Sequence, residues 1–414
     1  MQRRPGTPSL LRELNDRSAL ELLLTGGPMT RSQLGKHTGL SKVTASQLLA
    51  RLEDRGIVAV AGELAGGRGP NAALYAVVPS TAYVAGLHVE RDEVSAGVAD
   101  ITGNVIARIS VDPSDSADPV ALVRGAVLAA CASAGVPVES LRAFVIGTPG
   151  VLDPRTGDPR LAVNLPAWHE GVLDALRSDL GRPVTLENDV NLAAMAERAA
   201  GAALGVPDFV LVWIGIGLGL ATVLGGKLHR GVGGAAGEIG YLPVPGVPLP
   251  EDLTHPATGA FQRLVGAQAV LPLARSYGFT EPTAAAAVAA AVAAVGDGAA
   301  VDGAAVDGTA VGGAGTGARA ADDFLRELAV RVATGVAAIS VVLDPGLVVL
   351  GGDVGLAGGT ELASRVAADV GRLCPARPTV VPSAVDGWPV LRGAILAAVD
   401  QARAQLLASV AEPV

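Results

Sequence analysis

Aromatic residues and cysteines are scarce in this chain of 414 residues. Aromatics account for 3% of the residues although 50% are hydrophobic, so any core must consist mainly of valine, leucine, isoleucine and alanine. Two cysteines, Cys131 and Cys374, are too few for a disulfide framework or for most structural zinc sites. The length predicts two or three domains, each with enough apolar residues for its own core.

Long uncharged hydrophobic runs are nearly absent as well. The stretch closest to membrane length covers residues 209–226, and glycines interrupt it at five positions. This pattern predicts two buried strands joined by a turn instead of a membrane helix. The basic amino terminus at 1–5 lacks the apolar run of a signal peptide. We therefore expect a cytoplasmic protein with no membrane partner.

Positive charge is concentrated at the amino-terminal end of an acidic chain. The net charge is −9, yet residues 1–75 contain ten Lys and Arg residues against six Asp and Glu residues. A basic module on an acidic body predicts contact with nucleic acid at one end only.

Residues 18–60 have the pattern of a helix-turn-helix. Thr30 can cap a helix that reaches His37, and Ser41 can cap a second helix that continues through Arg55. Helical periodicity buries one face of this second helix, namely Ala45, Leu48, Leu49 and Leu52. Its cap and its outward face are predicted to contact DNA through Ser41, Lys42, Thr44, Ser46, Gln47 and Arg51.

Two short strands follow this pair of helices. They are expected at 57–60 and 74–78, and the glycine-rich segment between them carries Arg68. A basic tip of this kind suits the minor groove, where an arginine meets concentrated negative potential. Residues 1–78 are thus predicted to form a winged helix-turn-helix that binds duplex DNA. The alternative is a winged helix that binds protein and keeps a solvated basic face.

Polar residues gather where an apolar strand at 183–186 ends. Glu187, Asn188, Asp189 and Asn191 follow directly, at the start of an alanine-rich helix pattern that reaches Gly205. The carboxyl ends of strands in α/β units face the crevice in which ligands bind. Asp189 could act as a base on a sugar hydroxyl while the two asparagines read neighbouring hydroxyls. The alternative is a helix cap, because Asn and Asp are favoured there.

An ordered set of glycine-rich motifs surrounds this strand end. The motifs lie at 144–151, 164–168, 213–219, 225–227, 237–240, 344–345 and 350–352. Their order resembles the ROK family of repressors, uncharacterised frames and sugar kinases, over about residues 80–410. The resemblance implies an α/β protein whose body has the two-lobed actin-like (ribonuclease H-like) sugar-kinase fold. It also implies sugar contacts by Asn164, Asn188, Asp189, Glu238 and Gln262.

The expected domains follow from these two assignments. The winged module at 1–78 precedes a first lobe at 80–200, which a helix at about 389–412 completes. The second lobe covers 201–388 and contains a low-complexity loop at about 296–320. Alternation of apolar residues predicts that the first lobe opens with strands at 83–90, 94–100 and 105–111.

The phosphate-binding parts of the family pattern are altered in this chain. His88 stands where the kinases have an aspartate, and Glu90, Arg91 and Asp92 occupy the first phosphate loop. Carboxylates there would repel a triphosphate. Ile216 replaces a threonine of the second loop. We therefore expect no phosphate transfer from ATP.

The metal-binding part of the pattern is altered too. Tyr241 replaces a histidine that in the family touches sugar and binds zinc, and the cysteine cluster expected soon after is missing. A single histidine, His255, remains in that region, so the ligands of a tetrahedral zinc site are lacking. We expect neither a metal nor another cofactor.

These observations favour a sugar-responsive transcriptional regulator, a repressor of carbohydrate-metabolism genes. Its partners would be duplex operator DNA and a sugar or sugar-phosphate effector that it does not phosphorylate. A homodimer or a dimer of dimers is expected, because one recognition helix covers only a half-site. Two alternatives stay open: an active ATP-dependent sugar kinase with a fused DNA-binding domain, and a repressor that works without a ligand.

Overall fold

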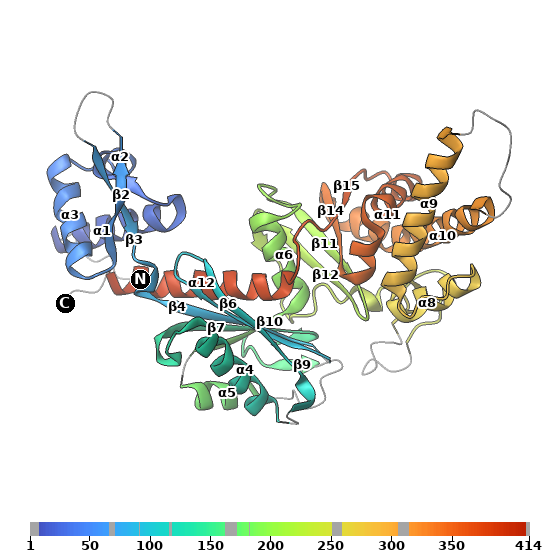
Figure 1. Ribbon diagram of the computed structural model, residues 1–414, viewed down its shortest axis with the longest axis horizontal. Coiled ribbons are helices and arrows are strands. Elements are labelled where there is room, and N and C mark those ends of the chain that lie inside the picture. Colours follow the sequence, from blue (N-terminus) through green and yellow to red (C-terminus); the bar gives the residue numbers. More distant parts are fainter. Residues whose placement is uncertain are drawn as a thin grey trace. The chain divides into compact units, whose positions relative to one another are not determined.

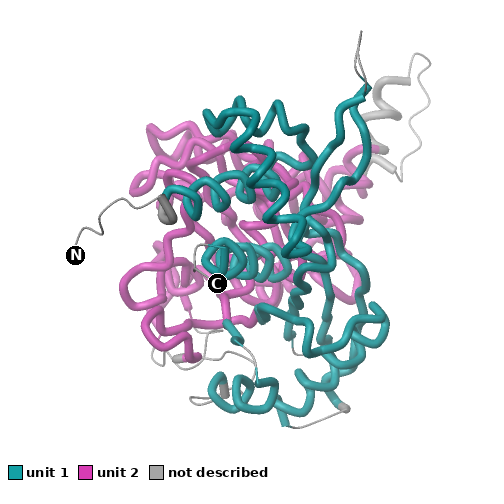
Figure 2. Tube along the Cα trace, turned by 90° about the vertical axis from the view of Figure 1, so that its left-hand side faces the viewer, with its two compact units in different colours: residues 1–146, 173–185, 394–414 teal, residues 147–172, 186–393 magenta. Residues whose placement is uncertain are grey.

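The computed structural model separates the chain into two compact units. Unit 1 comprises residues 1–146, 173–185 and 394–414, and unit 2 comprises 147–172 and 186–393 (Figure 2). The structure describes the following residues: 8–65, 71–90, 92–115, 118–161, 172–181, 183–250, 259–304 and 314–410. Within this described part of the chain, no helix is both long and apolar enough to cross a membrane.

Unit 1 begins with a small module of three helices and three strands (Figure 1). The elements are α1 (Pro8–Gly26), β1 (Met29–Thr30), α2 (Arg31–Thr38), α3 (Lys42–Asp54), β2 (Val58–Leu64) and β3 (Ala72–Val77). The strands form an antiparallel sheet in the order β1-β3-β2. Helices followed by a hairpin in this arrangement form a winged helix-turn-helix, as predicted. The wing tip at 66–70, and Arg68 with it, lies outside the described residues.

Side-chain caps fix the ends of the two helices that follow the first turn. Thr30 and Gln33 form a reciprocal capping box at the start of α2, and Gly39 ends that helix in the left-handed conformation, with φ of 72°. Ser41 caps α3 by accepting from the Thr44 amide. Both predicted caps are therefore confirmed. The predicted buried face of α3 is confirmed as well, because Ala45, Leu48, Leu49 and Leu52 are at most 2% exposed.

The rest of unit 1 is built on a five-stranded sheet in the order β10-β7-β4-β5-β6. Its strands are β4 (Tyr83–Val89), β5 (Val94–Asp100), β6 (Val105–Val111), β7 (Leu141–Thr148) and β10 (Val184–Asn188). The strands β4, β5 and β6 pair antiparallel, which confirms the predicted opening of the body. The last residues of β7 and β10 pass into unit 2.

Helices and short 3-10 turns complete unit 1. They are η1 (Pro79–Thr81), η2 (Pro113–Asp115), α4 (Pro119–Ala134), η3 (Val138–Ser140), α5 (Val172–Leu180) and α12 (Pro389–Val410). Helix α12 approaches β4 closely at Gly86, where an added Cβ would lie 2.7 Å from the Ile395 nitrogen. The carboxyl-terminal helix predicted at about 389–412 is thus packed on this sheet.

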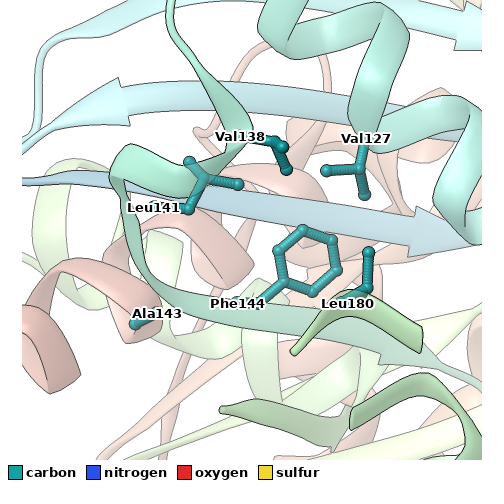
Figure 3. Close-up of a pocket in the computed structure, with 6 residues that line it drawn as sticks. All are labelled: Val127, Val138, Leu141, Ala143, Phe144 and Leu180. Carbon is teal, nitrogen blue, oxygen red and sulfur yellow. The ribbon is translucent and has the colours of Figure 1, made fainter. Parts of the chain in front are cut away.

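A small pocket in unit 1 is entirely apolar (Figure 3). It lies between α4, β7 and the end of α5. Its walls are the side chains of Val127, Val138, Leu141, Ala143, Phe144 and Leu180. With no polar group to orient a ligand, it is a packing defect of the aliphatic core and not a candidate site.

Unit 2 contains a second five-stranded sheet, in the order β13-β12-β11-β14-β15. Its strands are β11 (Phe209–Ile214), β12 (Leu218–Leu224), β13 (Lys227–Leu228), β14 (Leu347–Gly351) and β15 (Thr379–Pro382). β11 and β12 form an antiparallel hairpin, as predicted for 209–226, while β14 runs parallel to β11. Val, Leu and Ala dominate the core around this sheet, and its buried aromatics include Phe209, Phe261 and Phe324.

The remaining elements of unit 2 are mainly helices. They are the hairpin β8 (Val151–Leu152) and β9 (Pro159–Leu161), then α6 (Asp189–Ala200), η4 (Ile239–Tyr241), α7 (Gln262–Val265), α8 (Ala267–Ser276), α9 (Ala284–Ala304), α10 (Ala314–Leu343) and α11 (Gly352–Leu373). Helix α6 stops short of the predicted end at Gly205, because the chain turns extended at Gly201.

The low-complexity segment is more helical than its composition suggested. A loop was expected at about 296–320, but α9 continues to Ala304 and α10 already begins at Ala314. Alanine is the best helix former, and a glycine inside a helix costs only about 1 kcal/mol relative to it, so alanine-rich sequence can carry a helix past several glycines. The part of the expected loop at 305–313 lies outside the described residues.

Candidate functional site

The junction between β10 and α6 brings the polar strand end into unit 2. Asn188 is the N-cap of α6, where its Oδ1 accepts from the Asn191 amide at 3.1 Å. Its Nδ2 donates to the Gly150 carbonyl at 3.1 Å and so ties the helix start to the glycine-proline turn after β7. Asn188 therefore has a structural role. One oxygen lone pair and one amide hydrogen remain for a ligand.

Asp189 is the first residue of α6 and is half-buried. Its Oδ1 accepts from the Val190 amide at 2.8 Å. Burial raises the pKa of this carboxyl to about 6, and the amides of Val190 and Asp189 oppose that rise. A raised pKa means that the site disfavours the ionised carboxylate unless further donors reach it.

Glu238 is the second carboxylate of the site. Burial, and then the charge of Asp189, raises its pKa to about 7. Because the charge of one carboxyl acts on the other, the two lie near each other in unit 2. With pKa values of about 6 and 7, the pair binds on average roughly half a proton at pH 7, so it can both accept from and donate to ligand hydroxyls.

The position of Glu238 depends on the glycine that precedes it. Gly237 has φ of 107°, and an added Cβ there would lie 2.0 Å from the Leu220 carbonyl oxygen. The Leu220 amide donates to the Gly237 carbonyl at 2.9 Å. Only glycine permits this close contact between residue 237 and β12. The contact fixes the backbone position of Glu238, the next residue in the chain.

An ion pair between Glu187 and Arg230 fastens the two halves of the site together. Glu187 Oε2 accepts from Arg230 Nε at 2.7 Å and Nη2 at 2.6 Å. Its Oε1 accepts from Asn191 Nδ2 at 2.9 Å and from the Asn188 amide at 3.0 Å. Arg230 begins the glycine-rich loop that ends at Glu238. This pair was not predicted, because 43 residues separate its members and no local pattern joins them.

Gln262 bonds to the backbone of the turn between β11 and β12. Its Nε2 donates to the Ile216 carbonyl at 2.7 Å, and its Oε1 accepts from the Leu218 amide at 2.8 Å. With 8% of the residue exposed, it secures the turn between β11 and β12. The predicted sugar contact of Gln262 stays untested, as does that of Asn164, which lies outside the described residues.

The segments that bind phosphate in the sugar kinases look different here. Ile216 projects from the β11–β12 turn with 58% exposure. In unit 1, the His88 side chain on β4 is 13% exposed, and its partial burial lowers its pKa to about 4. It is therefore neutral at physiological pH, although Glu90 Oε1 lies 3.6 Å from its Nε2. Glu90 begins a tight turn, in which its backbone amide donates to the Glu93 carbonyl at 2.9 Å. Arg91 lies outside the described residues.

The parts of the chain that the structure describes contain no set of side chains that could ligate a metal ion. No group of three or more His, Cys, Asp or Glu residues there could hold a metal ion. His255 falls in the segment 251–258, which is outside those parts.

The predicted DNA-contacting residues of α3 divide into free and occupied side chains. Lys42 and Gln47 are exposed. The hydroxyls of Ser41 and Thr44 lie 2.9 Å apart and belong to the helix cap. Ser46 Oγ donates to the Lys42 carbonyl at 2.8 Å and accepts from Arg31 Nη1 at 2.9 Å. Arg31 thereby joins the basic surface at the start of α3, which sequence reasoning had not assigned to it.

Arg51 does not have the free guanidinium that was predicted. It binds Asp16 of α1 through both Nε, at 3.0 Å, and Nη2. The hydrogen bond to Asp16 raises the pKa of the guanidinium above its usual range. The helical wheel placed Arg51 outside the buried face but could not show that α1 supplies a carboxylate beside it. The side chain thus links α1 to α3, and its predicted contact with DNA stays untested.

A winged helix-turn-helix followed by two α/β units with paired carboxylates at a strand end defines a class of protein. It is the class in which a DNA-binding module precedes an actin-like sugar-kinase fold. The family follows from the sequence: residues 84–397 match the model of the ROK family, and the chain belongs to that family. Residues 14–69 match a model of the MarR family, so the amino-terminal module is a MarR-like winged helix.

Known proteins similar to this chain include regulators and kinases. The xylose repressor of Caldicellulosiruptor bescii is 26% identical over 244 residues, which are 58% of this chain and 61% of that protein. The chain thus spans about three-fifths of that relative's length. A crystal structure of a ROK family transcriptional regulator, a homologue of the E. coli MLC protein, aligns with a TM-score of 0.69 at 17% identity, over 97% of this chain and 99% of that one. A Streptomyces griseus ROK glucokinase in complex with glucose and AMPPNP aligns with a TM-score of 0.56 at 25% identity, over 76% and 98%.

Proposed function

We propose that this chain is a sugar-responsive transcriptional repressor that binds its effector without phosphorylating it. The observation that carries the proposal is the combination of two modules in one chain. A MarR-like winged helix with an exposed recognition helix precedes a ROK body that keeps a pair of carboxylates at a strand end. The similarity to the C. bescii xylose repressor supports the same combination of functions.

The proposed effector is a polyhydroxy compound, either a sugar or a sugar phosphate. Asp189 and Glu238 are the two groups that gain most from its hydroxyls, because burial has left both short of hydrogen-bond donors. Asn188 contributes its unused amide positions. The Glu187–Arg230 pair holds the loop that delivers Glu238, and it does so without occupying either member of the carboxylate pair.

The proposed lack of phosphate transfer rests on the altered phosphate-binding segments. A kinase of this fold must bring backbone amides and hydroxyls to a triphosphate. In this chain Ile216 offers neither a hydroxyl nor a charge. Glu90 and Asp92 add negative charge at the other segment. The missing hydroxyl at Ile216 and the added negative charge of the two carboxylates each oppose binding of a triphosphate.

Regulation requires that the effector favour one of two states of a dimer. Two copies are needed because each recognition helix covers a half-site. A sugar that binds the DNA-free state more tightly than the DNA-bound state weakens operator binding by the ratio of those affinities, and by no more than that.

The proposal is tested by a thermal-shift screen of pentoses, hexoses and amino sugars, each with and without ATP and Mg²⁺. We expect a shift that depends on the sugar and is unchanged by ATP. The sugar that gives it should then change the affinity for promoter DNA in a fluorescence-anisotropy titration. A protein that binds no promoter DNA at low salt, alone or with any of these sugars, is not the proposed repressor.

A sugar kinase is the second candidate, and a specific observation favours it. Asp189, with a pKa of about 6, is suited to act as a general base near neutral pH. The S. griseus glucokinase also aligns over 98% of its length. A coupled assay of ADP release decides between the two: turnover that needs both sugar and ATP, and that is lost in Asp189→Asn, identifies a kinase.

A repressor that works without a ligand is the third candidate. A protein that binds promoter DNA but shows no sugar-dependent shift in the thermal-shift screen is such a ligand-independent repressor.

A further inference from the structure

The outward face of α3 is centred on three residues, of which only Gln47 was predicted from the sequence to contact DNA. Successive residues of an α-helix are 100° apart around its axis. The four buried residues define one side of α3, and the point opposite their centre falls on Val43, Gln47 and Ala50. Val43 is 67% exposed, and Gln47 and Ala50 are exposed as well. A surface that meets the helix head-on therefore touches Val43 and Gln47 first.

Apart from Lys42, the polar residues beside this centre are already engaged. Thr44 belongs to the Ser41 cap, and Ser46 is bound to the Lys42 carbonyl and to Arg31. Arg51 is held by Asp16. The amide of Gln47 and the methyl groups of Val43 are thus the recognition groups at the centre of the helix.

The surroundings of Val43 indicate what covers it. Lys42 lies beside it on α3, and Arg31, the first residue of α2, reaches α3 through its hydrogen bond to Ser46. A basic surface fits a polyanion better than it fits an apolar protein patch. In the major groove of duplex DNA the apolar group is the C5-methyl of thymine. The amino-terminal residues of a recognition helix are also the ones that reach base edges.

We propose that Val43 is a specificity-determining residue that packs on a thymine methyl, next to an adenine that Gln47 reads through N6 and N7. This rests on the proposed DNA-binding function and adds to it the chemistry of the half-site. Side chains at i and i+4 are about 5–6 Å apart. Bases of one strand are spaced by about 3.4 Å. The thymine and the adenine therefore lie one or two base steps apart.

The test removes a single methyl group from the DNA. Full-length protein first enriches duplexes from a random-sequence pool, and each thymine of the enriched site is then replaced in turn by deoxyuridine. We expect one position in each half-site at which this replacement weakens binding of the wild type roughly three- to tenfold. Val43→Ala should bind the thymine and deoxyuridine duplexes alike, because the side chain that contacts the methyl is gone.

A matched control separates this effect from a general one. Val330→Ala removes the same atoms from an exposed valine on α10, in unit 2, and should keep the wild-type sensitivity to deoxyuridine. Because Val43 packs against nothing in the protein core, Val43→Ala should unfold at the wild-type temperature.

The outcomes distinguish this proposal from the function on which it rests. If the pool yields a site but no deoxyuridine replacement changes affinity by more than twofold, Val43 does not read thymine, while the DNA-binding function stands. The same holds if Val43→Ala keeps the wild-type sensitivity. If the pool yields no enriched sequence and the protein binds no duplex at low salt, the DNA-binding function itself is wrong.

Discussion

Replacement of Asp189 by asparagine should make the ligand-free protein more stable at pH 8 and weaken its binding of sugar. The pKa of Asp189 is about 6 in the folded protein, against an ordinary value of 3.8. The folded state thus binds the proton more tightly than the unfolded state does. Between about pH 4 and pH 6 the stability therefore falls as pH rises, and above that range the full cost of ionisation is present.

The magnitude follows from the size of the shift. A rise from 3.8 to about 6 corresponds to roughly 3 kcal/mol, as an upper bound, at 1.36 kcal/mol for each pKa unit. Asparagine can still accept from the Val190 amide. It loses the favourable charge at the helix start, which is worth about 0.3–1 kcal/mol. We expect a net gain of about 1–2 kcal/mol at pH 8 and almost none at pH 4.

The effect on sugar binding has the opposite sign. A charge-assisted hydrogen bond from a ligand hydroxyl contributes about 1.5–3 kcal/mol. Its loss in Asp189→Asn should weaken sugar binding roughly ten- to a hundredfold. DNA binding without sugar should stay near the wild-type value, because Asp189 is far in sequence and in function from the winged module.

Urea titrations at pH 4 and pH 8, followed by tryptophan fluorescence, measure the stability change. Calorimetry with the sugar found by thermal shift measures the affinity. Asp353→Asn is the matched control, because Asp353 is an exposed aspartate in the first turn of α11. It should lose a few tenths of a kcal/mol at both pH values. If Asp189→Asn is less stable than the wild type at pH 8, the helix-start role outweighs burial and the reasoning is refuted.

Three further predictions concern contacts described above. Gln47→Ala should change sequence preference by about 1–3 kcal/mol at one base pair, measured by competition among duplex variants; equal loss on all sequences would contradict this. Arg51→Met leaves the carboxylate of Asp16 unpaired and should destabilise the winged module by about 1–3 kcal/mol in a thermal melt. It should not alter the salt dependence of DNA binding, whose slope would fall by about one if Arg51 bound a phosphate. Arg230→Lys, which cannot donate to Glu187 Oε2 from two nitrogens at once, should weaken sugar affinity several-fold in calorimetry while the melting temperature changes little.

Local sequence signals were sufficient where the determining residues are close together in the chain. The caps at Thr30 and Ser41, and the buried side of α3, follow from residues within one or two helical turns of each other. Alternation of apolar residues likewise predicted β4, β5 and β6, because successive side chains of a strand point to opposite faces of the sheet. Such patterns depend on backbone geometry alone.

Contacts between distant segments could not be predicted in this way. Glu187 was recognised as a strand-end carboxylate, but its partner Arg230 stands 43 positions later, in a loop with no periodicity. Arg51 was placed on the correct side of its helix, yet Asp16 of α1 decides what it binds. Gln262 shows the same limit, because its amide bonds to a turn 44–46 residues earlier.

The carboxylate pair explains how the proposed repressor would bind sugar without phosphorylating it. A general base is useful only if a phosphoryl group is held in line with the hydroxyl that it activates. In the proposed repressor, whose Ile216 lies on the exposed turn, the raised pKa at Asp189 would serve no phosphoryl transfer. The same raised pKa still favours a ligand, because hydroxyl donors relieve the cost of burying two neighbouring carboxyls. In the proposed repressor, that relief is the free energy with which a sugar would stabilise one state over the other.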